Sequence, residues 1–210
     1  MTRERILQKV RTALGREAGQ AAPSLPPARL PIPETDPETR ILRFSKAVVN
    51  LAGKIYRTDS GSDACSYASA LLQGKASVAS NAPFLQECGI TALPGVRTGV
   101  RDEAELRRLC AVADVGITCA DFALADTGTL VMISSTAEAR MVSLLPPVHL
   151  AVLPGERILS GLEELFTRLP EPGRRASSMV FITGPSRTAD IEQILIRGVH
   201  GPGEIHIVIV

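Results

Sequence analysis

The chain has 210 residues, which is enough for one substantial domain and an appendage. Its 23 basic and 22 acidic residues give a formal net charge of +1 and are spread along the chain, so neither a nucleic-acid-binding face nor a surface for anionic membranes is indicated. Aromatic residues make up 3% and tryptophan is absent, which leaves backbone groups and hydroxyls, rather than stacking rings, to form a binding site.

Cysteine and histidine spacing argues against a metal or iron-sulfur site. The four cysteines show no C-x-x-C spacing and the three histidines show no zinc motif; these residues are Cys65, Cys88, Cys110, Cys119, His149, His200 and His206. We therefore expect no disulfide framework, no metal and no bound cofactor. Because the sequence shows no signal peptide and no apolar run of about 18 residues, it predicts a cytoplasmic protein without a membrane span.

Residues 1–19 are predicted to form a basic amphipathic helix, with Ile6, Val10 and Leu14 on one stripe. Three interpretations are open: a docking helix for a partner or for a sister subunit of a homo-oligomer, a solvated terminal helix, or a membrane-surface or targeting helix. Residues 20–37 contain six prolines, too dense for helix or sheet, so this stretch is predicted to be an extended linker.

Residues 38–210 are predicted to form one α/β domain, because helical and strand-like runs alternate along them. Helices are expected at residues 41–52, at 64–72, between 82 and 89, after a capping box at 102–105, and at 138–143, 161–168 and 189–196. Strands are expected at residues 55–57, 76–79, 115–118, 130–133, 149–153, 179–182 and 205–210. These strands are rich in valine and isoleucine without polar alternation, which is typical of an open, mostly parallel sheet with helices on both faces. Such sheets bind ligands beyond the carboxyl ends of their strands.

A polar turn at residues 183–188 follows one predicted strand and precedes a predicted helix, so it is a candidate pocket for an anion. The candidate ligand-binding residues here are Thr183, Gly184, Ser186, Arg187 and Thr188. The alternative is that Ser186 or Thr188 only caps the helix and that Arg187 pairs with Asp190.

A second polar turn, at residues 125–129, precedes the strand at 130–133. Asp126 is the candidate catalytic carboxylate, as a general base or nucleophile, with Thr127, Gly128 and Thr129 binding the ligand beside it. The alternative is an aspartate that only hydrogen-bonds its own turn. We expect the two turns to meet at the carboxyl edge of the sheet.

Three further positions complete the candidate site. Arg140 either clamps a ligand anion or pairs with Glu138 at the surface. His200 lies in a glycine-rich turn and is a candidate ligand-binding residue, whereas His149 and His206 are interpreted as structural. No dinucleotide, Walker or G-x-S-x-G motif occurs.

Four segments together resemble the lactate-utilisation protein C family, which carries a LUD domain. They are ALADTGTLV at residues 123–131, LLPPVH at 144–149, ITGPSRTADIE at 182–192 and GVHGPG at 198–203. The resemblance runs from about residue 40 to the end of the chain. It implies a fold similar to the sugar-phosphate isomerase and CoA-transferase superfamily. The commoner family motif has glutamate before Thr-Gly-Thr where this chain has Asp126, which argues against a glutamate-dependent covalent mechanism here.

The resemblance also implies a role in oxidising L-lactate to pyruvate beside two partner proteins that carry iron-sulfur clusters. This chain then corresponds to the cluster-free component, because its cysteines lack cluster spacing. Two functions stay open: a non-redox subunit that binds a small anion such as lactate or pyruvate, or a stand-alone enzyme acting on a sugar phosphate or an acyl-CoA. A pure scaffold is disfavoured by the two polar turns.

Overall fold

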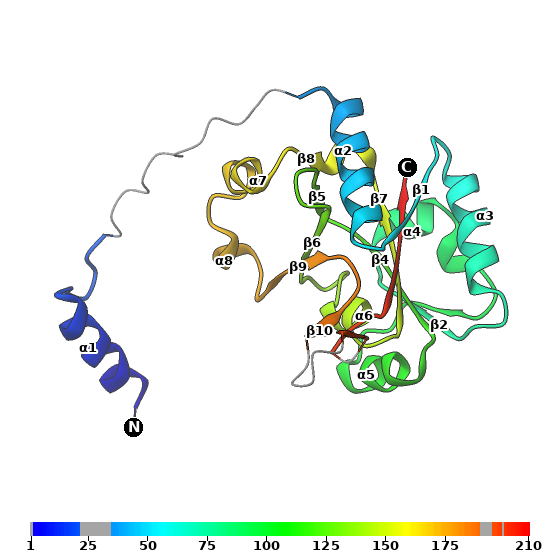
Figure 1. Cartoon of the computed structure of the whole chain (residues 1–210). Coiled ribbons are helices and arrows are strands. Elements are labelled where there is room, and N and C mark those ends of the chain that lie inside the picture. The colour runs from blue at the N-terminus through cyan, green and yellow to red at the C-terminus, as the bar shows by residue number, and fades with distance from the viewer. Residues whose placement is uncertain (1, 22–34, 190–194, 199) are drawn as a thin grey trace. The chain divides into compact units, whose positions relative to one another are not determined.

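The computed structural model describes residues 2–21, 35–189, 195–198 and 200–210 (Figure 1). The chain divides into two compact units, Met1–Pro31 and Ile32–Val210. The first unit contains helix α1 (Arg3–Leu14), which lies within the predicted segment 1–19 and ends at Gly15 in the left-handed conformation. Its apolar residues Ile6, Val10 and Leu14 are 49%, 49% and 64% exposed. Most of the predicted linker lies outside the described residues.

A six-stranded sheet in which every pair of neighbours is parallel forms the centre of the second unit. In spatial order its strands are β1 (Lys54–Arg57), β12 (Glu204–Ile209), β7 (Val148–Leu153), β4 (Val115–Cys119), β2 (Ser77–Ala79) and β3 (Val96–Arg97). The two-residue β3 is too short to show any period in the sequence and was not predicted.

Helices cover both faces of this sheet, which confirms the predicted fold class (Figure 1). On one face lie α3 (Gly61–Leu72), α4 (Pro83–Glu87) and the 3-10 turn η1 (Ile90–Ala92), packed against Leu150 and Val152 of β7. On the other face α2 (Pro37–Asn50) packs against Ala151 and Leu153, and α5 (Glu103–Val112) and α6 (Arg140–Leu144) pack against Val78 of β2. Successive residues of the central strands β4, β7 and β12 are buried on alternate faces of the sheet, which is why the sequence shows continuous apolar runs.

A second sheet holds two of the strands that the sequence assigns to the parallel sheet. Its order is β8 (Ile158–Leu159), β5 (Phe122–Leu124), β6 (Thr129–Ile133) and β9 (Met179–Thr183), with β6 antiparallel to both neighbours. Leu130 of β6 faces the α2 core while Val131 faces α7 (Leu162–Arg168). The prediction of strands at 130–133 and 179–182 is therefore confirmed, but their place in the main sheet is wrong.

The predicted helix at residues 189–196 is also wrong. β10 (Arg187–Ala189) and β11 (Leu195–Arg197) form an antiparallel pair, and residues 190–194, including Asp190, lie outside the described residues. The Ser186 amide donates to the Pro202 carbonyl at 2.8 Å and the Gly198 amide donates to the Ser186 carbonyl at 3.0 Å. These bonds tie the turn to the segment before β12, so the Ser186 amide is not free to open a helix.

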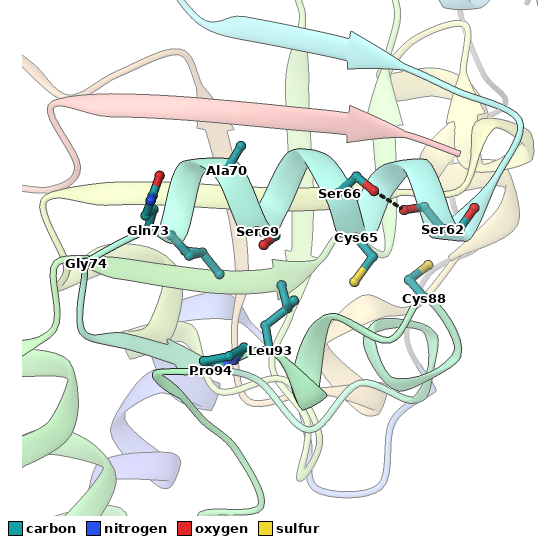
Figure 2. A pocket seen from close by; sticks show the side chains of 11 residues that line it. Ser62, Cys65, Ser66, Ser69, Ala70, Gln73, Gly74, Cys88, Leu93 and Pro94 are labelled. Atoms are coloured by element: carbon teal, nitrogen blue, oxygen red, sulfur yellow. Dashed lines mark hydrogen bonds between the residues drawn. The ribbon is translucent and has the colours of Figure 1, made fainter.

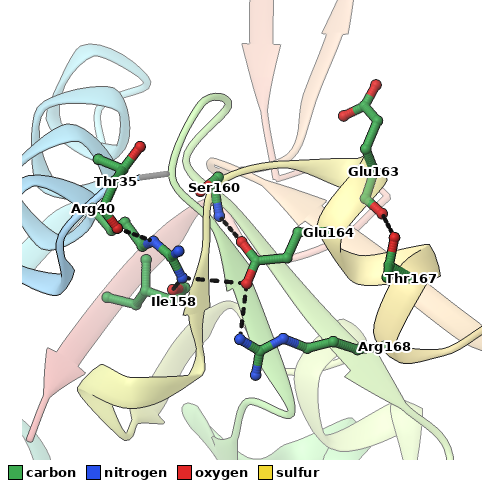
Figure 3. A network of polar contacts seen from close by, with 8 residues as sticks. All are labelled: Thr35, Arg40, Ile158, Ser160, Glu163, Glu164, Thr167 and Arg168. Atoms are coloured by element: carbon green, nitrogen blue, oxygen red, sulfur yellow. Dashed lines mark hydrogen bonds and ion pairs between the residues drawn. The ribbon is translucent and has the colours of Figure 1, made fainter. Parts of the chain in front are cut away.

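A polar network joins α2 to the second sheet and to α7 (Figure 3). Arg40 of α2 donates to Glu164 Oε1 at 3.2 Å, and Arg168 donates to the same oxygen at 2.8 Å. The Ser160 amide donates to the other carboxylate oxygen at 2.8 Å. Every charge in this network has a partner, which indicates a structural role. The remaining short elements of this region are η2 (Gly155–Arg157) and α8 (Pro172–Arg175).

Two of the three histidines are buried in the main sheet, as the sequence predicts for structural residues. His206 is held between Tyr67, whose hydroxyl is 2.7 Å from Nδ1, and Glu204, whose Oε1 is 2.8 Å from Nε2. His149 is fully buried, with Nε2 2.7 Å from Thr118 Oγ1. Its Nδ1 has no partner among the described residues.

Burial of His149 lowers the pKa of its imidazole to about 4. Between about pH 6.5 and pH 4 the unfolded chain binds a proton here that the folded chain does not, so the free energy of unfolding should fall as pH is lowered through this range, by about 3 kcal/mol. Urea denaturation of wild type and His149→Gln at several pH values measures this. The stability advantage of wild type over the variant should shrink below about pH 6.5, and a constant difference would contradict the neutral buried imidazole.

Candidate functional site

The loops after β2 and β4 diverge at the carboxyl edge of the main sheet. β2 and β4 are neighbours, but β2 leads to β3 on one side, whereas the next parallel strand after β4 is β7 on the other side. In open α/β sheets a crevice forms outside the carboxyl ends where successive connections run in opposite directions. Ser80 and Asn81 follow β2 at this point, and Ala120 and Asp121 follow β4.

A cavity of about 1050 Å³ opens beside the loop that follows β2. Its walls come from residues 79–82, from the segment 98–101, from the loop between β6 and α6, and from the two serines before β9. The lining is rich in hydroxyls and contains two guanidinium groups; its main polar residues are Ser80, Asn81, Arg101, Ser134, Arg140 and Ser178. Such a lining offers hydrogen bonds and positive charge to an anion.

Asn81 holds three walls of this cavity together. Its side-chain amide donates to the Val100 carbonyl at 3.1 Å and its side-chain oxygen accepts from the Gly99 amide at 2.8 Å. Its backbone amide donates to the Ala137 carbonyl at 2.8 Å. The loop that carries Arg101 and the loop that leads to Arg140 are therefore fixed relative to the end of β2.

Glu138 lies beneath the cavity and is only 6% exposed. Its Oε2 accepts from Ser80 Oγ at 2.8 Å and from the Cys119 amide at 3.4 Å, and its Oε1 is buried with no partner among the described residues. Burial raises the pKa of this carboxyl to about 8, so it carries a proton at neutral pH. A surface ion pair between Arg140 and Glu138, one of the two interpretations from the sequence, is therefore wrong, while Arg140 lines the cavity.

The end of β4 places further polar groups close to Glu138. Asp121 Oδ2 accepts from the Ile133 amide at 2.6 Å, and burial raises the pKa of this carboxyl. Arg157 donates to the Ala120 carbonyl at 3.2 Å and approaches Cys119 Sγ at 3.6 Å. Burial raises the pKa of the Cys119 thiol to about 12, so the thiol stays protonated and is not a nucleophile at neutral pH.

The two predicted polar turns do meet, but away from this cavity. Thr127 Oγ1 is 2.7 Å from Thr129 Oγ1, which is 2.8 Å from Thr183 Oγ1. Gly128 and Gly184 both have positive φ and press against the end of α2, where an added Cβ would lie 2.9 Å from Ala47 and Leu51 respectively. This end of α2 leads into the amino end of β1. The predicted meeting at the carboxyl edge is therefore wrong, because β6 and β9 belong to the antiparallel sheet.

Arg187 has a partner within the protein. Its Nη2 donates to the Leu51 carbonyl at 2.5 Å, just beyond the last residue of α2. A cation is stabilised at the carboxyl end of a helix by the helix dipole, whereas the sequence predicts that Arg187 serves an anion at a helix amino terminus. The structure corrects that role: Arg187 acts as a helix cap.

The remaining predicted residues are spread out. Asp126 is exposed at the turn between β5 and β6, with Oδ2 2.7 Å from where a Cβ on Gly161 would lie. Ser186 packs against Gly201, and His200 beside it is exposed. The side chain of Thr188 lies outside the described residues. Of the predicted residues whose side chains the structure describes, Arg140 alone lines the carboxyl-edge cavity.

A second hollow of about 940 Å³ runs along α3 (Figure 2). Small and polar side chains such as Ser62, Ser69 and Gln73 line it, together with Cys65 and Cys88. No charged residue contributes to its lining, so it offers little to recognise an anion. The cavity at the carboxyl edge is therefore the stronger candidate site.

The described residues contain no group of three or more His, Cys, Asp or Glu side chains placed to hold a metal ion. No helix in the described ranges is long and apolar enough to cross a membrane.

Residues 41–210 match the family model of the LUD domain. The chain belongs to the LUD domain family. It is 38% identical over 130 residues to lactate utilization protein C of Halalkalibacterium halodurans, covering 58% of this chain and 56% of that one. It is 40% identical over 105 residues to lactate utilization protein C of Shouchella clausii, covering 49% and 46%. This LUD chain thus spans about half the length of the curated relatives it matches.

Among solved structures, this LUD domain is similar to a DUF162 family protein from Deinococcus radiodurans determined at 1.70 Å resolution. The TM-score is 0.64 at 18% sequence identity, and the match covers 84% of this chain and 99% of that one. The likeness shows a shared fold.

Ser80 and Glu138 were not predicted as site residues from the sequence, because a glutamate in a polar loop is normally exposed. The sequence did carry one signal for this site: the hydroxyl residues 134–136 stand next to Glu138 in the loop after β6.

Proposed function

We propose that this LUD domain is the cluster-free component of an L-lactate utilisation system and binds a small carboxylate such as L-lactate or pyruvate in the carboxyl-edge cavity. The observation that carries the proposal is the cavity itself, which combines Arg101 and Arg140 with a hydroxyl-rich lining at the divergence of the β2 and β4 loops. The relatives named lactate utilization protein C supply the class of ligand.

The partners in this proposal are the iron-sulfur proteins of the same system, which carry the electrons, and the location is the cytoplasm. All four cysteines are free thiols, which is compatible with a reducing compartment. The exposed apolar stripe of α1, flanked by basic residues, is suited to docking on a partner or on a second copy of the chain.

A stand-alone enzyme acting on a sugar phosphate or an acyl-CoA is the second candidate. One observation favours it: a cavity of about 1050 Å³ is at the upper end of the range for ligand pockets and is far larger than a three-carbon acid requires. Calorimetric titration with L-lactate, pyruvate, inorganic phosphate and acetyl-CoA discriminates between the two functions. Binding of acetyl-CoA or phosphate without either carboxylate would contradict the first.

Arg140→Ala should weaken binding of the carboxylate by about tenfold or more, because a charge-assisted hydrogen bond contributes roughly 1.5–3 kcal/mol. The matched control is Arg187→Ala, which removes a guanidinium at the end of α2. It should leave the dissociation constant unchanged and lower the free energy of unfolding by about 1 kcal/mol.

The opposite result, with Arg187→Ala weakening binding and Arg140→Ala having no effect, would move the site to the linked hydroxyls of Thr127, Thr129 and Thr183. Asp126 would then regain the catalytic role predicted from the sequence. Asp126→Asn in a lactate-growth complementation assay tests that role separately.

A further inference from the structure

One buried carboxyl, that of Glu138, is hydrogen-bonded to a hydroxyl that lines the cavity. Ser80 lines the cavity, and its Oγ lies 2.8 Å from Glu138 Oε2. Glu138 is more than nine-tenths buried, and its Oε1 has no partner within the described structure. The Ser80 amide donates to the Ile117 carbonyl at 2.9 Å, which fixes the position of the serine at the end of β2.

We propose that the Ser80–Glu138 pair recognises the second oxygen of a 2-hydroxy or 2-oxo carboxylate, with Arg140 binding the carboxylate group and the Ser80 hydroxyl, oriented by Glu138, forming a hydrogen bond with the second oxygen. This inference rests on the proposed function and names the specificity-determining residues of the same site. The Ser80–Glu138 pair distinguishes such acids from simple carboxylates of the same length, such as propionate.

The hydrogen bonds balance in two arrangements. When Glu138 is neutral with its proton on Oε2, the bond to Ser80 reverses: the carboxyl donates to Ser80 Oγ, and the Ser80 hydroxyl turns to donate to a keto or hydroxyl oxygen of the ligand. When Glu138 is ionised, Ser80 donates to Oε2 and its oxygen accepts from a ligand hydroxyl, which pyruvate lacks. The pair therefore donates to the ligand in the first state and accepts from it in the second.

The groups around Glu138 set which state prevails. Asp121 and Cys119 lie next to it at the end of β4, Arg157 lies beside Cys119, and Arg140 and Arg101 line the cavity. Burial raises the pKa of Glu138 to about 8, so the donating state is present at neutral pH and gives way to the accepting state in mildly alkaline solution.

Calorimetric titration of the full chain with L-lactate, pyruvate and propionate, at about pH 6.5 and about pH 9, tests the proposal. Wild type should bind lactate and pyruvate about tenfold or more tightly than propionate at the lower pH, the effect of one hydrogen bond to a buried polar pair. Ser80→Ala should bring the three dissociation constants to within about twofold of one another. Ser69→Ala, at a serine of the separate hollow along α3, is the matched control and should keep the preference.

The pH dependence isolates Glu138. In wild type the preference for pyruvate over propionate should decline at the higher pH, whereas in Glu138→Gln it should be the same at both. This comparison of wild type with Glu138→Gln still tests the role of the Ser80–Glu138 pair if Ser80→Ala fails to fold. Equal binding of all three acids by wild type, or an unchanged preference in Ser80→Ala, would overturn this inference and leave the proposed function standing. No binding of any of the three would overturn both.

Discussion

Replacing Gly116 by alanine is expected to destabilise the domain by about 3 kcal/mol or more. Gly116 lies in the middle of β4, where an added Cβ would lie 1.9 Å from the Val142 carbonyl oxygen of α6 and 3.0 Å from Pro146 Cγ. The backbone of β4 cannot shift to relieve the overlap, because Gly116 pairs with Val78 of β2 on one side and with His149 of β7 on the other. The overlap is with backbone, so rotation of a side chain cannot relieve it.

Urea denaturation followed by circular dichroism measures this loss. Gly173→Ala is the matched control, because an added Cβ there meets nothing within 4 Å and Gly173 lies in α8, where alanine is favoured over glycine. A Gly116→Ala protein that unfolds at the same urea concentration as wild type would mean that α6 does not pack directly on β4. A displacement of α6 in the variant would also move Arg140, which is the first residue of that helix and lines the cavity.

The second large effect concerns the pH dependence of stability at Glu138. The pKa of this carboxyl is about 8 in the folded protein against an ordinary value of 4.5. Between these values the folded protein holds a proton that the unfolded chain has lost, so the free energy of unfolding falls as pH rises from about 4.5 to about 8, by an amount on the order of 5 kcal/mol. Glu138→Gln removes this loss and should become more stable than wild type as pH rises.

Thermal or urea unfolding of the two proteins at pH values across this range measures the difference, which should be small near about pH 5 and largest above about pH 8. Glu103→Gln, a cavity residue that is exposed, should show no such trend. A Glu138→Gln protein whose stability relative to wild type does not change with pH would show that the carboxyl is ionised in the folded state. Together with His149, which costs stability in acid, this predicts maximal stability in mildly acidic solution.

The loss of stability caused by burying Glu138 points to a functional role for this residue. A buried carboxyl with an unpartnered oxygen opposes folding, and residues that oppose folding yet stand beside a ligand cavity are candidates for a role in binding or proton transfer. The structural network of Arg40, Glu164 and Arg168 is the contrast, because there the carboxylate accepts three hydrogen bonds. Glu138 accepts two bonds at one oxygen and none at the other among the described residues.

The amino-acid sequence by itself determined the α/β class, the parallel character of the main sheet and most helices, because these depend on local patterns. The Asp102 capping box is an example: Asp102 Oδ1 accepts from the Glu105 amide at 2.7 Å at the start of α5. The family also follows from the sequence, since its motifs are contiguous in the chain. In each case the signal lies within a few residues of the element it specifies.

Tertiary structure alone decided how the strands divide between two sheets and where the site lies. Leu130 and Val131 are buried on opposite faces of β6, between the α2 core and α7, so this strand has the same apolar pattern as a strand of the main sheet. The partner of Arg187 is the carbonyl of Leu51, 136 positions away, which no local motif can indicate. Glu138 is buried only because the ends of β2 and β4 converge on it, and burial of this kind depends on contacts between distant segments rather than on spacing along the chain.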